Sequence, residues 1–114
     1  MNHWSNSSLH NTQDFGFTYV ITNKLNYKKY IGCKQFKFAR NRSSKWETYT
    51  GSSTTLNKDI KTLGKDNFTF EILATYKTKQ LLKYAEAKLI INNNCIFDSN
   101  YYNEFLSIKI RNKK

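Results

Sequence analysis

Two short runs of alternating residues, separated by a polar turn, constrain the fold of this chain more than any other feature. The first run covers residues 15–22. In it, Phe17, Tyr19 and Ile21 alternate with Thr18, Val20 and Thr22, as the side chains on the two faces of a strand do. The second run, residues 27–33, follows at once after the polar residues 23–26. Two strands joined by so short a connection predict an antiparallel β-hairpin.

The rest of the chain predicts three helices and one further strand. Residues 34–42 favour a short helix, and residues 56–63 carry Leu and Ile at helical spacing before Gly64, a typical helix end. Residues 68–73 alternate like a half-buried strand, and residues 78–93 form the longest predicted helix. The order β-β-α-α-β-α predicts an α+β fold in which helices pack on a small sheet.

Length and charge limit the classes of function. At 114 residues and 13.5 kDa the chain is sufficient for one domain, which we expect over residues 15–108. Nineteen Lys and Arg against eight Asp and Glu give a formal net charge of +11, which favours a polyanionic partner such as nucleic acid. No apolar run is long enough for a membrane span or signal peptide, so we expect a cytoplasmic protein. We also expect a monomer in solution.

The two ends of the chain and its cysteines carry weaker signals. Residues 1–14 are rich in Asn, Ser and His, which predicts a flexible arm or a loosely docked strap. Residues 109–114 form a basic tail that either adds nonspecific hold on DNA or is a disordered solubilising end. Cys33 and Cys95 lack CxxC spacing, so a zinc site is not expected.

A pair of tyrosines is the first candidate for chemistry. If residues 23–26 form the loop, Tyr19 lies directly opposite Tyr30, with their Cβ atoms about 5 Å apart on one face. Gly32 lies on the same face, where its missing side chain would let a sugar-phosphate backbone approach. The competing interpretation is ordinary cross-strand packing of two aromatic rings.

One carboxylate occupies an unusual position. Glu86 falls in the middle of the apolar stripe of the last predicted helix, flanked by Leu82, Leu89 and Ile90. A carboxylate placed there must be neutralised, hydrogen-bonded or bound to a metal. It is therefore either a functional acid or a buried structural partner for a tyrosine hydroxyl or for Arg40.

Together these features resemble the GIY-YIG endonuclease family, and in particular its phage homing-type branch. The resemblance covers residues 15–108 and rests on Phe17-Thr18-Tyr19, Tyr30-Ile31-Gly32, Arg40, Glu86 and Asn103. The first motif departs from the family pattern, because Phe17-Thr18 stands where Gly-Ile is usual. The family implies a three-stranded antiparallel sheet flanked by helices, an essential arginine, a metal-binding glutamate and often an asparagine beyond it.

The resemblance also implies roles for these residues in phosphodiester hydrolysis. We expect Glu86 to bind a single Mg²⁺ or Mn²⁺ and Arg40 to bind the same phosphate. Tyr19, whose pKa we expect nearby positive charge to lower, is the candidate general base, and Tyr49 is the second candidate for that role. Tyr30 is expected to orient the water or the phosphate. Asn103 is expected to hold the last helix and the hairpin together or to position Glu86.

The remaining expectations concern the substrate. The residues expected to bind the DNA backbone are Lys28, Lys29, Gly32, Lys34 and Lys37. One active site on a monomer predicts nicking of one strand, and the phage-like resemblance suggests a mobile element acting in a bacterial host. Two alternatives stay open: a non-catalytic nucleic-acid-binding protein with a GIY-YIG-like fold, and an RNA-binding structural protein.

Overall fold

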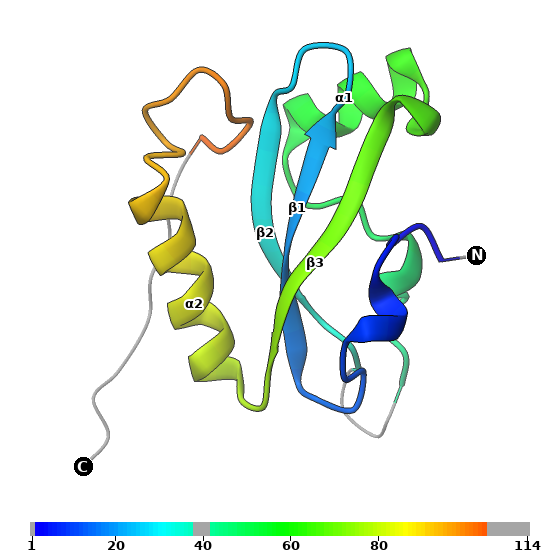
Figure 1. Cartoon of the computed structure of the whole chain (residues 1–114), viewed down its shortest axis with the longest axis vertical. Coiled ribbons are helices and arrows are strands. Elements are labelled where there is room, and N and C mark those ends of the chain that lie inside the picture. The colour runs from blue at the N-terminus through cyan, green and yellow to red at the C-terminus, as the bar shows by residue number, and fades with distance from the viewer. Residues whose placement is uncertain (1, 38–41, 105–114) are drawn as a thin grey trace.

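The structure is a computed structural model that describes residues 2–37 and 42–104. Its centre is a three-stranded antiparallel sheet of strand order β2-β1-β3 (Figure 1). The strands are β1 (Gly16–Asn23), β2 (Lys29–Gln35) and β3 (Phe68–Tyr76). The helices are α1 (Thr54–Leu63) and α2 (Lys79–Asn92), with short 3-10 turns η1 (Ser7–Leu9), η3 (Trp46–Thr48) and η4 (Lys65–Asn67). The predicted α+β fold with a small antiparallel sheet is confirmed.

The hairpin register differs from the prediction. Tyr19 pairs with Gly32 and Ile21 pairs with Tyr30, so Tyr19 and Tyr30 are diagonal rather than direct neighbours. The loop lies one residue further along the chain than predicted, because Asn23, which was expected in the turn, is fully buried and belongs to β1. Its side-chain amide donates a 3.0 Å hydrogen bond to the Tyr102 hydroxyl. The pairing shifts by two positions, which preserves the shared face of the two tyrosines.

The short helix predicted for residues 34–42 is wrong where the structure describes them. Lys34 and Gln35 belong to β2, and Lys37 forms an isolated antiparallel bridge with Ser43. Burial of Phe36 explains the extended backbone: its amide donates to the Phe15 carbonyl at 2.9 Å, which continues the pairing with the neighbouring strand. Residues 38–41, which include Arg40, lie outside the described residues.

Both longer helices begin at side-chain caps. The Ser53 side chain accepts a hydrogen bond from the Leu56 amide at the start of α1, and the Thr78 side chain accepts one from the Leu81 amide at the start of α2. Gly64, with φ of 94°, ends α1 as predicted. The described part of the chain contains no helix with both the length and the apolar character needed to cross a membrane.

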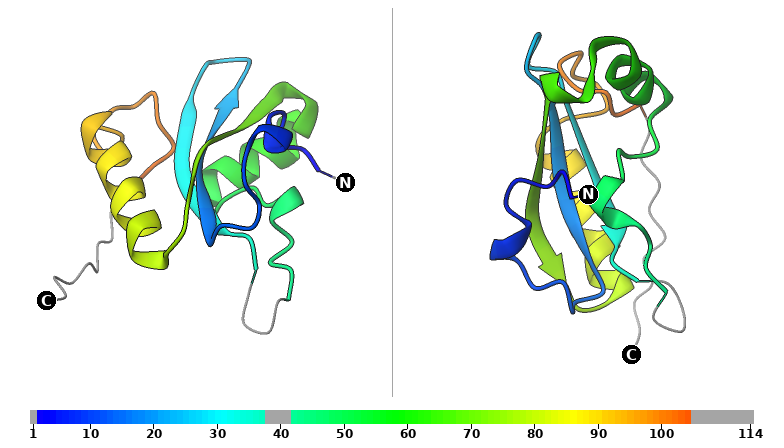
Figure 2. Two further views of the ribbon diagram at one scale, coloured as in Figure 1. Left: turned by 60° about the horizontal axis from the view of Figure 1, so that its bottom comes forward. Right: turned by 90° about the vertical axis from the view of Figure 1, so that its right-hand side faces the viewer.

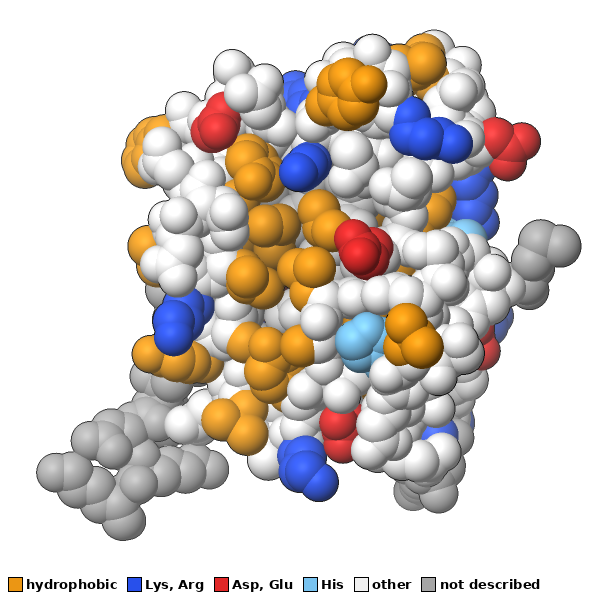
Figure 3. Space-filling view, in the orientation of Figure 1, with side chains coloured by type: hydrophobic (Ala, Val, Ile, Leu, Met, Phe, Trp, Pro, Cys, Tyr) orange, Lys and Arg blue, Asp and Glu red, His pale blue; other side chains and the backbone are white. Residues whose placement is uncertain are grey.

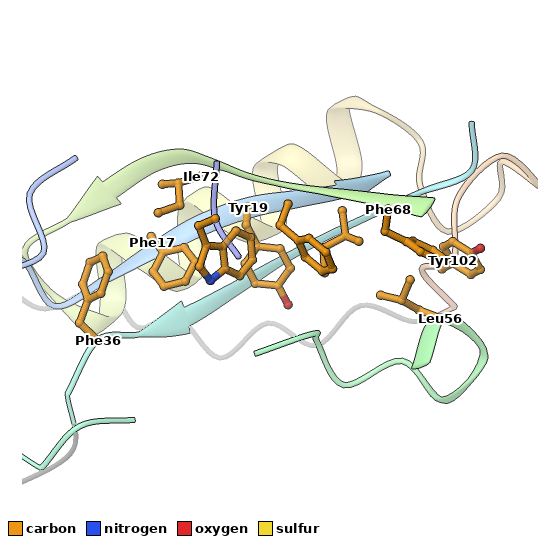
Figure 4. Packing of buried hydrophobic residues seen from close by; sticks show 10 residues of the cluster. Phe17, Tyr19, Phe36, Leu56, Phe68, Ile72 and Tyr102 are labelled. Atoms are coloured by element: carbon orange, nitrogen blue, oxygen red, sulfur yellow. The ribbon is translucent and has the colours of Figure 1, made fainter. Parts of the chain in front are cut away.

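The two faces of the sheet are covered differently. One face bears a large, mostly aromatic cluster that α1 and η3 help to cover, and Figure 4 shows Phe17, Tyr19, Ile72 and Tyr102 within it. The other face packs against α2, where Ile31 of β2 meets Ile90 and Cys95. Side chains on α2 therefore approach the sheet from the side opposite to Tyr19 and Tyr30.

The start of the N-terminal segment is docked, which agrees with the strap and not with the flexible arm among the two predicted alternatives. Trp4 is only 3% exposed and packs edge-on against Phe17 and Phe70. The backbone amide of Ser5 donates to the Phe70 carbonyl at 3.0 Å. The Asn6 side chain binds both backbone groups of Ile72, at 2.7 and 2.8 Å. We call residues 2–6 the N-terminal strap, which Figure 2 shows running beside β3.

Candidate active site at the edge of β2

Three phenols meet on the aromatic face of the sheet near its β2 edge. The Tyr19 ring lies 6.2 Å, centre to centre, from both the Tyr30 and the Tyr49 ring. Tyr19 is 1% exposed, whereas Tyr30 and Tyr49 are half-buried and reach solvent. The Tyr30 hydroxyl lies 3.3 Å from the Ser52 hydroxyl. Tyr30 and Tyr49 are therefore the phenols of this group that a substrate can touch.

Two glycines make room for this group. A Cβ atom at Gly32 would collide with the Tyr19 hydroxyl and lie 2.7 Å from the ring carbon that bears it. A Cβ atom at Gly51, whose φ is 83°, would lie 2.8 Å from the Tyr30 ring and 3.1 Å from the Tyr19 hydroxyl. The absent side chain of Gly32 thus accommodates Tyr19, rather than opening the strand to a sugar-phosphate backbone as expected.

The phenols are harder to ionise than free tyrosine. Burial, followed by the neighbouring Tyr30 and Tyr49, raises the pKa of Tyr19 well above its usual range. Burial also raises the pKa of Tyr30 and of Tyr49, although a hydrogen bond from the Tyr19 hydroxyl partly offsets the rise at Tyr49. The expected acidification of Tyr19 is therefore wrong for the protein alone, because desolvation outweighs any nearby positive charge.

Glu86 reaches the same region from the other face of the sheet. It is half-buried on α2, and its negative charge contributes to the raised pKa values of all three phenols. Burial, and then Glu86, to which the thiol donates a hydrogen bond, raise the pKa of Cys33 to about 12. Cys33 follows Gly32 on the edge strand and points to the α2 side. The carboxylate and the phenols therefore approach one another around the edge of β2.

The basic residues expected to bind DNA are distributed along β2 and its two ends. The ammonium of Lys34 lies 4.4 Å from the centre of the Tyr49 ring, and Lys28 lies 4.7 Å from that of Tyr102. Lys29 and Lys37 are exposed. Lys34 is thus the member of this group in contact with the phenols, an arrangement that stabilises a positive charge over an aromatic ring.

Asn103 holds the edge strand in place. Its side-chain oxygen accepts from the Ile31 amide at 3.1 Å, and its side-chain nitrogen donates to the Ile31 carbonyl at 2.8 Å. The neighbouring Tyr102 amide donates to the Lys29 carbonyl at 2.7 Å. Asn103 is 6% exposed and binds the backbone beside Tyr30, so it acts on the site by positioning β2.

The N-terminal strap fixes the loop that carries Tyr49. The His3 ring nitrogen Nε2 lies 3.0 Å from the Tyr49 carbonyl, and the Trp4 indole N–H donates to the Trp46 carbonyl at 2.7 Å. His3 also stacks on Phe70 at 3.9 Å. Burial, and then the charge of Lys65, lower the pKa of His3 to about 4, which keeps the ring neutral near pH 7.

Several residues of this site were not singled out from the sequence as site residues. Gly51 and Ser52 lie in the loop between Tyr49 and α1, and a glycine so close to an aromatic residue is a signal that could have identified this loop. Cys33 follows the second tyrosine motif directly, but a lone cysteine carries no such signal. His3 could not be assigned, because its partners Tyr49 and Phe70 are far away in sequence.

The donor set around Glu86 suits a weakly held, largely hydrated ion. Within residues 2–37 and 42–104 no three His, Cys, Asp or Glu side chains group together as a metal cage. A single half-buried carboxylate fits Mg²⁺, which keeps several of its waters and is often held by one or two carboxylates and a phosphate. The residues present are thus compatible with a single ion at Glu86.

Comparisons with known proteins agree with this geometry. The family model described as "Putative endonuclease segE, GIY-YIG domain" matches residues 2–106. Endonuclease segA of Enterobacteria phage T4 is 35% identical over 81 residues, which are 71% of this chain and 34% of that protein.

A second protein of the same phage, putative endonuclease segE, is 34% identical over 89 residues, which are 78% of this chain and 40% of that protein. This chain thus spans less than half the length of either relative. No solved structure gives a significant match. Because the family model covers nearly the whole sequence and the predicted motif residues of the described part gather at one edge of its sheet, the chain belongs to the GIY-YIG endonuclease domain family.

Proposed function

We propose that this chain hydrolyses phosphodiester bonds in DNA, using one Mg²⁺ or Mn²⁺ ion at Glu86, and that it nicks one strand at each encounter. The observation that carries the proposal is the grouping of three phenols near the edge of β2, with ring centres 6.2 Å apart in two of the pairs, where the charge of Glu86 on α2 acts on each of them. The formal net charge of +11 supports a polyanionic substrate. The two phage endonucleases that share this domain support a role in a phage or mobile element inside a host cell.

The exposure of Tyr19 and Tyr49 decides which of them acts on the substrate. Tyr49 reaches solvent and accepts a hydrogen bond from Tyr19, so Tyr49 in its phenolate form takes the proton from the attacking water. Tyr19, which is too buried to touch substrate, stabilises that phenolate. The Lys34 ammonium over the Tyr49 ring adds favourable charge. This assignment moves the general base from Tyr19, the first candidate from the sequence, to Tyr49, the second candidate.

The remaining groups bind and orient the substrate. Tyr30, held by Ser52, is placed to orient the water or a phosphate oxygen. Arg40 stays the predicted ligand of the scissile phosphate. When bound at Glu86, a divalent ion would stabilise negative charge on the phosphoryl oxygens and on the departing 3′ oxygen. Asn103 contributes by holding the strand from which Tyr30 projects.

The test is cleavage of supercoiled plasmid with Mg²⁺ and with chelator. Wild-type protein should convert the plasmid to open circles only with the ion, and Glu86→Gln should lower the rate about a thousandfold. DNA affinity, measured by fluorescence anisotropy in chelator, should remain within twofold. The matched control is Glu71→Gln, an exposed carboxylate on β3, which should cleave like wild type.

Each other outcome has a definite meaning. A Glu86→Gln protein that cleaves at the wild-type rate contradicts the metal assignment. Prompt linear product at low protein concentration contradicts nicking. Wild-type protein that binds DNA without cutting it under any ionic condition supports the non-catalytic alternative.

A further inference from the structure

The turn between β1 and β2 exposes two large apolar side chains at its tip. Tyr27 is 75% exposed and Leu25 is 60% exposed, and among the described aromatic residues only Tyr84 and Phe97 are likewise classed as exposed. Single exposed apolar residues are common, but two at the tip of one protruding turn form a small apolar contact surface. Figure 1 shows this turn at the same end of the sheet as α1.

The turn is rigid rather than floppy. The Asn23 amide donates to the Lys28 carbonyl at 2.8 Å, and the Tyr27 amide donates to the Asn23 carbonyl at 2.7 Å. Side-chain oxygens of Asn23 and Asn26 accept from the amides of Leu25 and Lys28, each at 2.9 Å. The side chains at the tip are therefore presented in fixed positions, which lowers the entropy lost when a partner binds.

The backbone of Tyr27 adopts a conformation that usually favours glycine. Its φ is 62°, the left-handed region that glycine and asparagine adopt readily and that strains a bulky side chain. The tyrosine makes this turn less stable than a glycine would, and its ring is mostly exposed to solvent. A strained and exposed aromatic residue points to a contact with a partner.

Lysines are frequent at this end of the sheet. Lys24, Lys28 and Lys29 belong to the turn or adjoin it. The neighbouring α1 adds Lys58 and Lys61, and the Lys24 amide of the turn donates to the Asn67 carbonyl of η4. The acids of these elements and their partners are Asp59, which accepts from the Tyr102 hydroxyl, Asp66, and Glu104, which accepts from the Thr55 hydroxyl of α1. Five lysines against three acids favour a phosphate backbone, and Figure 3 shows Lys or Arg side chains beside hydrophobic ones at this end.

We propose that this turn is a second DNA contact, in which Tyr27 packs against a sugar or base while the adjoining lysines bind phosphates. The inference rests on the proposed DNA substrate and adds a site to it. Tyr27 lies three residues from Tyr30 along the hairpin, which corresponds to about 10 Å of extended chain. At about 3.4 Å per nucleotide of one strand, the contact falls about three nucleotides from the cut phosphodiester.

The decisive variant is Tyr27→Gly, because structure and binding should respond in opposite directions. Glycine relieves the strained backbone, so the Tm should rise by a few degrees. Loss of the ring should weaken binding of a fluorescein-labelled 20-base-pair DNA duplex about tenfold, by anisotropy in chelator. Tyr27→Phe should keep wild-type affinity. Tyr84→Ala, which removes an exposed tyrosine from α2, should leave the affinity unchanged.

Further measurements separate this inference from the proposed function. Lys24→Ala should lower the slope of log affinity against log salt by about 0.9, the value for one phosphate contact. A Tyr27→Gly protein with higher Tm and wild-type DNA affinity overturns the inference, as does a lower Tm. Loss of affinity for single-stranded RNA but not for the duplex also overturns it. Weaker duplex binding by Tyr27→Gly, when wild-type protein cuts no DNA, sustains the contact and refutes the nuclease instead.

Discussion

An asparagine side chain binds the backbone of each edge strand of the sheet, but the two edges differ in the side chains that lie next to them. At the β3 edge, the Asn6 side chain binds the amide and the carbonyl of Ile72. At the β2 edge, the Asn103 side chain does the same to Ile31. Each asparagine satisfies backbone groups that would otherwise invite another strand to pair.

The two edges differ in the residues that lie beyond the backbone group to which each asparagine binds. Beyond Ile72 the strap leads to a packed tryptophan, Trp4. Beyond Ile31 the edge strand reaches Cys33, beside Glu86, and Lys34, beside Tyr49. Only at an edge can side chains from both faces of a sheet approach one another, because the strands block that approach elsewhere. The β2 edge thus joins a carboxylate from the α2 face to phenols from the aromatic face.

The largest of the three effects that separate the two edges tests whether chemistry belongs to the β2 edge. Tyr49→Phe should lower the cleavage rate about a hundredfold, as loss of a general base does. Since the pKa of Tyr49 is raised above its usual 10, little phenolate exists near pH 7, and the wild-type rate should rise about tenfold per pH unit between pH 7 and 9. The variant should lose this dependence. Tyr76→Phe on β3 is the control, and a pH-dependent rate that survives in Tyr49→Phe would exclude this base.

A matched pair of substitutions compares the edges directly. Asn103→Leu and Asn6→Leu should each lower the free energy of unfolding by about 1–3 kcal/mol, because each leaves backbone groups without partners. Only Asn103→Leu should also reduce cleavage, by about tenfold at saturating DNA, since it loosens the strand that carries Tyr30. Urea unfolding and single-turnover cleavage measure the two effects. Equal losses of cleavage in both variants would mean that the edges do not differ in function.

The smallest effect concerns the strap that links the β3 edge to the site. The pKa of His3 falls from 6.5 to about 4 on folding, so its contribution is complete above pH 6.5 and is lost as the pH falls toward 4. His3→Phe keeps the stack on Phe70 but cannot be protonated. Its Tm should therefore fall less between pH 7 and pH 5 than that of wild type, by a few degrees in calorimetry. An identical dependence of the Tm on pH in His3→Phe and wild type would refute this account.

Local patterns predicted most of the elements. The alternation in β1 and β3, the end of α1 at Gly64 and the apolar stripe of α2 all depend on neighbours in sequence, and the structure confirms them. The helix predicted for residues 34–42 is wrong over residues 34–37, because burial of Phe36 on the sheet outweighs helix propensity. The loop was misplaced because Asn23, a common turn residue, found a buried partner in Tyr102.

The sequence by itself determined that Tyr19, Tyr30 and Gly32 share a face, because the strand period of two survives a register shift of two positions. It also determined that a carboxylate interrupts the apolar stripe of α2. Only the tertiary structure decided which phenol reaches solvent and that Glu86 meets the phenols around an edge. Those outcomes depend on contacts between residues far apart in the chain, such as the strap with Tyr49 and Asn103 with Ile31, and no local pattern encodes such contacts.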